Sequence, residues 1–156
     1  LRTDSSVEAQ VRASTTYNMI IEGVMAETGY YSFHQVLTRN NLMPGMQQFV
    51  ANLKRDESRH IAFAIYFLSR LVAEHGDTAW NALEARMNEL MPLVIESNNL
   101  FNGFYTNGIP FGLDIDEFNE YSNTQFQKRF DRIQKSRNQS LAEINSIANS
   151  LDEVLA

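Results

Sequence analysis

Glu57 and His60 form a Glu-x-x-His pattern within LKRDESRHIAFAIYFLSRL, the segment of residues 53–71. Residues three apart on a helix share a face, with β-carbons about 5–6 Å apart, so a carboxylate and an imidazole can converge on one metal ion. Charged side chains beside an apolar run need such a partner when they are buried. The pattern therefore predicts half of a metal site, although the same spacing also occurs in helices with a solvated glutamate and a packed histidine.

A second carboxylate for this site is expected from the preceding apolar segment, YNMIIEGVMAETGYYSF. Two antiparallel helices joined by the short connection NNLMPG are neighbours. Glu22 precedes this turn by about 20 residues and Glu57 follows it by about 15, so at 1.5 Å per residue they lie at similar heights. Glu27 is the alternative ligand, and periodicity does not choose between the two glutamates. Asp56 and Arg59 flank the predicted pair as groups able to hydrogen-bond its ligands.

Helical periodicity dominates the chain and no hairpin signal appears, so we predict an all-α fold. Ser5 and Glu8 are expected to form a capping box, Pro44 suits a first helical position, and Gly76 is expected to end a helix. The segment TNGIPFGLD is a loop. Four helices are predicted over residues 6–39, 44–75, from 77 or 78 to about 105, and 115–155.

The chain has 156 residues, which suffices for one domain with its own core. We expect a single all-α domain or fragment over residues 1–156, in which the helix pair 6–75 carries the half-site and residues 77–156 add packing helices. The chain has no cysteine, which excludes thiolate chemistry, and its net charge of -6 argues against nucleic-acid binding. It has no apolar run of about 20 residues, and its first residues, LRTDSSVEAQ, lack the apolar core of a signal peptide. We expect a soluble, cytoplasmic protein with no membrane span.

The segments YNMIIEGVMAETGYYSFHQVL and RDESRHIAFAIYFL resemble the second half of the ligand-binding oxidases related to the radical-generating small subunit of ribonucleotide reductase. The resemblance is close over residues 17–71 and looser afterwards. It depends on the joint spacing of Tyr17, Glu22, Glu57 and His60 rather than on the four-residue motif alone.

The resemblance implies a ferritin-like helical bundle that assembles a Mn/Fe pair, or two Fe, binds a long-chain fatty acid and activates dioxygen. It also implies an ether crosslink between a tyrosine and a valine. On this chain it identifies Glu22, Glu57 and His60 as metal ligands and Tyr17 as the crosslinking tyrosine, with Tyr30 and Tyr31 as further phenols nearby. Asp56 is similar to an aspartate that hydrogen-bonds a metal-bound histidine of the other half.

The chain departs from this family in having only one Glu-x-x-His pattern. Two divalent ions bring four positive charges, which four carboxylates balance in the family and only Glu22 and Glu57 would balance here. We therefore expect either the C-terminal half of a longer protein, which the non-methionine first residue favours, or the pairing of two chains. A homodimer is expected.

Two other functional classes stay open. A ferritin-type iron store with a site shared between identical chains would also show one Glu-x-x-His pattern per chain. A metal-free helical interaction module would not bring Glu22, Glu57 and His60 together. His34 and His75 are expected to have structural roles, His75 because a histidine before Gly76 suits a helix C-terminus.

Overall fold

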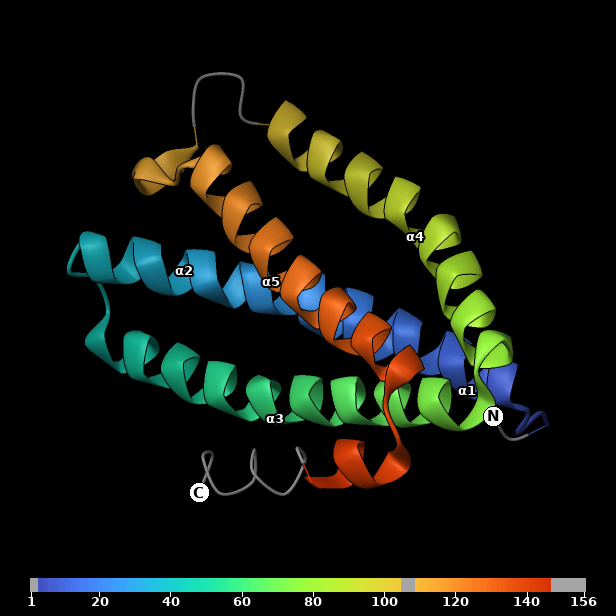
Figure 1. The fold of residues 1–156 in the computed structure, drawn as a ribbon. Coiled ribbons are helices and arrows are strands. Elements are labelled where there is room, and N and C mark those ends of the chain that lie inside the picture. The colour runs from blue at the N-terminus through green and yellow to red at the C-terminus, as the bar shows by residue number, and fades with distance from the viewer. Residues whose placement is uncertain (1–2, 105–108, 147–156) are drawn as a thin grey trace.

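The computed structural model describes residues 3–104 and 109–146, and this part of the chain contains helices and no strand, as the sequence predicts. A continuous helical rod begins near the N-terminus and ends at Arg39. The chain reverses direction at residues 40–43, and one long helix then lies antiparallel to the rod (Figure 1). The rod consists of α1, Val7–Ser14, a π-helical segment η1, Thr15–Ala26, and α2, Glu27–Arg39; the long helix is α3, Pro44–His75.

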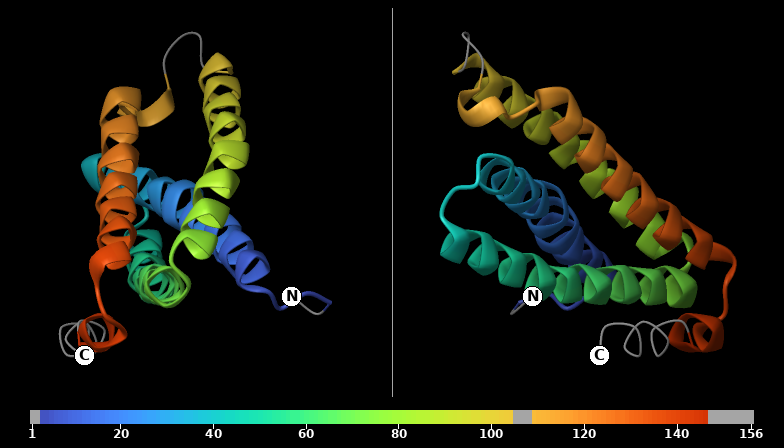
Figure 2. Two further views of the ribbon diagram at one scale, coloured as in Figure 1. Left: turned by 45° about the vertical axis from the view of Figure 1, so that its right-hand side comes forward. Right: turned by 90° about the vertical axis from the view of Figure 1, so that its left-hand side faces the viewer.

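Two further helices form a second layer on one side of this pair, as Figure 2 shows. They are α4, Asp77–Gly103, and α5, Ile115–Lys135, with two short 3-10 turns, η2, Pro110–Gly112, and η3, Ser136–Asn138. The helix α4 contacts α1, η1 and α3, whereas α5 contacts η1, α2 and α3. The π-helical segment therefore has neighbours from both layers.

The helix ends agree with the sequence prediction at most positions. Pro44 opens α3, and Gly76, at a φ of 54° that suits glycine, ends it. The predicted N-terminal cap is wrong by one residue, because Ser6 rather than Ser5 accepts a hydrogen bond, from the N–H of Ala9. Glu8 then stands two residues after the cap and forms no capping box with it.

The apolar core lies where the two layers meet. Trp80 packs against Phe130, with ring centroids 5.5 Å apart, and the guanidinium of Arg137 lies over the Trp80 ring at 5.0 Å. The core residues come from α1, η1, α3, α4 and α5: Val11, Met19, Ile20, Val24, Leu68, Leu71, Val72, Ala79, Trp80, Leu83, Met87, Val94 and Ile133. This contact between layers fixes the rod and α3 relative to each other. No helix among the described residues is long and apolar enough to cross a membrane.

The fourth predicted helix is wrong as one continuous element. The helix α5 ends at Lys135, Gln139 is extended, and a new helical turn begins at Ser140. Ser140 and Glu143 form a reciprocal capping box, because the Ser140 N–H donates to the Glu143 carboxylate and the Glu143 N–H donates to Ser140 Oγ. The rest of this prediction, residues 147–156, and the predicted end of the third helix at Tyr105 lie outside the described residues.

Candidate metal centre

The structure brings together the three residues proposed as ligands from the sequence. Glu22 projects from η1, and Glu57 and His60 project from α3, with one donor atom of each lying within 4.8 Å of the other two. His60 Nδ1 lies 3.5 Å from Glu22 Oε1 and 3.5 Å from Glu57 Oε2. Atoms that share an ion at bond lengths of about 2.0–2.2 Å are separated by at most about 4.4 Å, which both 3.5 Å separations satisfy. The 4.8 Å limit on the set exceeds this by a few tenths of an ångström, which a small rotation of a glutamate side chain can remove, so one ion can reach all three.

Glu22 lies in a helical segment that the sequence reasoning treated as an ordinary α-helix. Residues 15–26 instead follow the i→i+5 pattern of a π-helix, and at its end the Glu27 N–H donates to the Glu22 carbonyl five residues earlier. A π-helix has more residues per turn than an α-helix, so Tyr17 and Glu22, five residues apart, lie closer to one face than they would in an α-helix, where about 1.4 turns separate them. Such segments are rare and occur frequently at functional sites.

Two polar residues of the rod orient the Glu22 carboxylate. Asn18 Nδ2 donates to Glu22 Oε2 at 2.8 Å, and Ser14 Oγ donates to Asn18 Oδ1 at 3.1 Å. One carboxylate oxygen of Glu22 is thereby held by an amide while the other faces His60. The sequence analysis missed both residues, although an amide four residues before a glutamate is a recognisable helical pair.

The two carboxylates at this centre would be stabilised by a bound cation. Glu22 is 7% exposed, and Glu57 Oε2 is buried with no hydrogen-bond partner in the described part of the chain. A buried carboxylate without a partner is costly, and two carboxylates side by side repel each other. A divalent ion bound to both oxygens would remove both penalties, so the donor set fits a metal.

Glu27, the alternative ligand, has other partners. It forms an ion pair with the buried Arg129 and accepts a hydrogen bond from the Tyr121 hydroxyl at 3.3 Å. Burial of the Tyr121 ring, together with the nearby negative charge of Glu27, raises the pKa of Tyr121 to about 12. Because Glu27 is held on the α5 side of the rod, Glu22 is the glutamate that faces α3.

Tyr31, grouped with Tyr17 in the sequence analysis, belongs to this second network rather than to the Glu22 cluster. Its ring stacks on Tyr121 with centroids 3.8 Å apart, and its hydroxyl donates to Glu117 at 3.0 Å.

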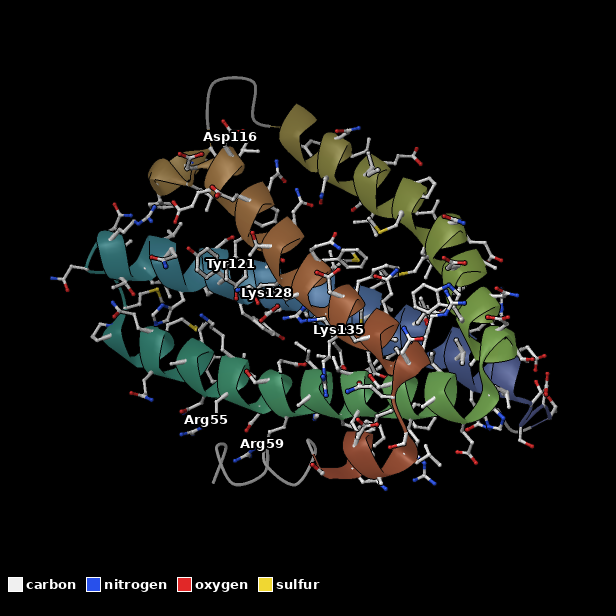
Figure 3. All side chains as sticks on the ribbon, in the orientation of Figure 1. Arg55, Arg59, Asp116, Tyr121, Lys128 and Lys135 are labelled. Atoms are coloured by element: carbon white, nitrogen blue, oxygen red, sulfur yellow. The ribbon has the colours of Figure 1, made fainter. Side chains whose placement is uncertain are left out.

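Asp56 and Arg59 form an exposed ion pair with each other at 3.4 Å. Figure 3 shows Arg55 and Arg59 on the side of α3 that points away from the rod. Within residues 3–104 and 109–146, neither Asp56 nor Arg59 is hydrogen-bonded to Glu22, Glu57 or His60. Their predicted role at the metal centre therefore stays a prediction about groups outside the described residues.

The centre lies at an open face of the described chain, where Glu22 is buried, Glu57 is partly buried and His60 is exposed. The His60 side chain is 58% exposed, and Tyr17 is 56% exposed. Large apolar side chains on the same two elements are also exposed, namely Ile21, Phe49 and Phe63. In the described residues His34 and His75 join no metal-competent cluster.

Comparison with known proteins gives one family. The family model described as ribonucleotide reductase, small chain, matches residues 2–136. The fold is similar to the R2-like ligand-binding oxidase from Sulfolobus acidocaldarius, with a TM-score of 0.76, 31% identity, and coverage of 92% of this chain and 46% of that chain.

Two further solved structures are variants of an R2-like ligand-binding oxidase with a reconstituted Mn/Fe cofactor. One was reconstituted aerobically, with a TM-score of 0.74, 34% identity and coverage of 83% of this chain and 47% of that chain. The other was reconstituted anaerobically, with a TM-score of 0.71, 36% identity and coverage of 83% and 46%. The chain thus spans about half the length of these structures.

Replacing His60 by alanine is expected to weaken manganese or iron binding in the assembled protein. Loss of residues that only support ligands already costs about 10–100-fold in metal affinity, so loss of a ligand should cost at least the upper part of that range. Metal content after equilibrium dialysis measures the effect. His34→Ala is the matched control, and equal losses in both variants would contradict the assignment.

Tyr121 is expected to titrate about two pH units above an ordinary tyrosine, since its pKa is raised from 10.0 to about 12. Its protonated form is favoured in the folded state, so its contribution to the free energy of unfolding is complete below pH 10 and is lost as the pH rises towards 12. Ultraviolet titration of phenolate, compared with Tyr121→Phe, measures this. A wild-type Tyr121 that ionises near pH 10 would contradict its placement beside Glu27.

Proposed function

Because the chain belongs to the ribonucleotide reductase small-chain family, the family that residues 17–71 resemble, we propose that it supplies half of a di-metal carboxylate site in an oxygen-activating oxidase. The observation that supports this most is the convergence of Glu22, Glu57 and His60 around the unpartnered Glu57 Oε2. The other half would bring the remaining carboxylates and a second histidine to the open side of the centre.

The donor set indicates which metals are bound. Carboxylate oxygen suits manganese, imidazole nitrogen suits iron, and the chain offers no sulfur from cysteine. The similar solved structures are described with a reconstituted Mn/Fe cofactor. We therefore propose Mn and Fe, or two Fe, as the cofactor; when bound, the metals would supply the activation of dioxygen.

The residues of this chain would then orient and enclose the reaction. Asn18 holds one oxygen of Glu22, so the other oxygen is directed at the ion. His60 and Asp56 are exposed, and a second half that covers them could place a histidine N–H where it donates to the Asp56 carboxylate. Once covered, this face would exclude water from the reacting groups.

A cavity of about 600 Å³ lies between α2, α4 and the start of α5. Its lining is mostly apolar and includes Val24 and Met25, two and three residues after Glu22. A cavity of this size and character is suited to a small apolar molecule, since ligand pockets are about 300–1,000 Å³ and mainly hydrophobic. We propose that it holds a long-chain fatty acid or a similar ligand near the metals.

Tyr17 is proposed to form an ether crosslink with a valine of the other half. It stands five residues before Glu22 in the same π-helical segment and its side chain is 56% exposed, so a partner residue can reach it. The phenol O–H and a valine C–H would be lost as the O–C bond forms, and dioxygen would accept the two electrons and two protons.

Oxygen treatment of the assembled, metal-loaded protein is expected to produce a peptide pair joined through Tyr17 and lighter than its parts by two hydrogens. Peptide mass mapping detects it. Tyr17→Phe should abolish the species and leave metal binding intact, because the phenol is not a proposed ligand. A fully loaded, oxygen-treated wild type without the crosslink would contradict this part of the function and favour the iron-storage alternative.

Gly29 lines the cavity, and a β-carbon added there would meet nothing within 4 Å. Gly29→Phe is therefore expected to fill the cavity without disturbing the fold and to lower fatty-acid affinity by at least about 10-fold, which is roughly the 1.4 kcal/mol lost with two buried methylene groups. Titration with a long-chain fatty acid measures this. Gly45→Phe, at a glycine with equal free space outside the cavity, is the control. Unchanged binding in Gly29→Phe would place the ligand elsewhere.

A further inference from the structure

Arg129 links α5 to the π-helical segment. The residue is 8% exposed, and its guanidinium donates both to the backbone carbonyl of Gly23 and to the carboxylate of Glu27. Gly23 directly follows Glu22, the proposed ligand, and Glu27 begins α2. One side chain from the second layer thus contacts the rod at the junction between its π-helical and α-helical parts.

The contact from Arg129 supplies a donor to a backbone carbonyl at this junction. The Glu27 N–H donates to the carbonyls of Glu22 and Val24 and passes over the carbonyl of Gly23, which it would bond in an α-helix. Arg129 donates to that carbonyl instead. A buried carbonyl is costly without a donor, so the guanidinium stabilises the i→i+5 register relative to the α-helical one.

Gly23 is the residue that permits this approach. A β-carbon at this position would lie 2.9 Å from the Asn18 carbonyl oxygen and 3.1 Å from Arg129 Nη1. Both distances are shorter than ordinary carbon contacts. The register of the π-helix and the contact from Arg129 therefore both depend on the missing side chain.

We propose that Arg129 is a positioning residue for the metal centre: it holds residues 15–26 in the π-helical register and so directs Glu22 towards Glu57 and His60. Successive residues of an α-helix turn by about 100°, so relaxation of the register by one residue would swing Glu22 off the face that it shares with α3. The consequence for metal binding rests on the proposed function, whereas the hold on the helix does not.

The substitution Arg129→Lys distinguishes the positioning role of Arg129 from neutralisation of the Glu27 charge. Arg129→Lys keeps a positive charge beside Glu27 but loses the planar fork that serves a carbonyl and a carboxylate together. Arg39→Lys is the matched control, because Arg39 also forms a two-point contact with a carboxylate, Glu117, at the exposed end of the rod. Gly23→Ala is a second variant, which displaces the guanidinium without removing it.

Hydrogen exchange of the assembled, metal-free protein is the first measurement. In Arg129→Lys the backbone amides of residues 15–28 are expected to exchange at least about 10-fold faster than in the wild type, while the exchange rates in the other helices stay unchanged. If Arg129→Lys does not fold, Gly23→Ala should show the same increase. Arg39→Lys should leave this segment as in the wild type. Wild-type exchange in Arg129→Lys, or an increase spread over all helices, would overturn the proposal.

Manganese affinity of the same variants is the second measurement. Arg129→Lys is expected to lose about 10–100-fold in affinity, as for residues that orient ligands, while Arg39→Lys keeps the wild-type value. Wild-type affinity in Arg129→Lys would overturn the positioning role and leave the metal centre standing. A wild-type protein that binds no manganese or iron would remove the proposed function instead, and hydrogen exchange alone would then decide whether Arg129 holds the helix.

Discussion

The buried carboxylate of Glu22 is the constraint on which the rest of the site depends. A carboxylate that is 7% exposed within an apolar helix is costly to bury without donors or a cation. Asn18 supplies one donor from the same helix, and His60 faces the other oxygen from α3. The π-helical segment carries Glu22, and the antiparallel helix α3 brings Glu57 and His60 beside it. The Glu57 oxygen without a hydrogen-bond partner lies in the same cluster.

The π-helical segment keeps two acidic groups apart by turning them to different neighbours. Glu22 faces α3, whereas Glu27 forms an ion pair with Arg129 of α5 and accepts a hydrogen bond from Tyr121 of the same helix. The two networks lie on opposite sides of one rod, so the cation from α5 does not compete with a metal for Glu22. The lining of the cavity includes Val24 and Met25, so an apolar ligand bound there, as proposed, would lie beside residues that follow Glu22 by two and three positions.

Much of the fold could be predicted from sequence because local rules decide it. Periodicity and the residues Pro44 and Gly76 gave α3 its observed bounds, and the joint spacing of Tyr17, Glu22, Glu57 and His60 identified the family. The break after Lys135 was missed although Ser140 and Glu143 carry a capping-box signal that outweighs continued apolar spacing.

The remaining features depend on contacts between distant parts of the chain. The π-helix requires a donor from α5 at the Gly23 carbonyl, and nothing near Gly23 in the sequence specifies Arg129. Arg129 also pairs with Glu27, which favours Glu22 as the ligand in the choice that periodicity left open. The exposure of the His60 side chain likewise depends on which helices pack around it, and the spacing of apolar residues along one helix does not specify those neighbours.

Anomalous diffraction from crystals of the assembled, manganese- and iron-loaded protein tests the central claim most directly. The account predicts an anomalous peak at bonding distance, about 2.0–2.2 Å, from a carboxylate oxygen of Glu22, a carboxylate oxygen of Glu57 and a nitrogen of His60. A fully loaded protein whose anomalous peaks all lie away from these three side chains would contradict it.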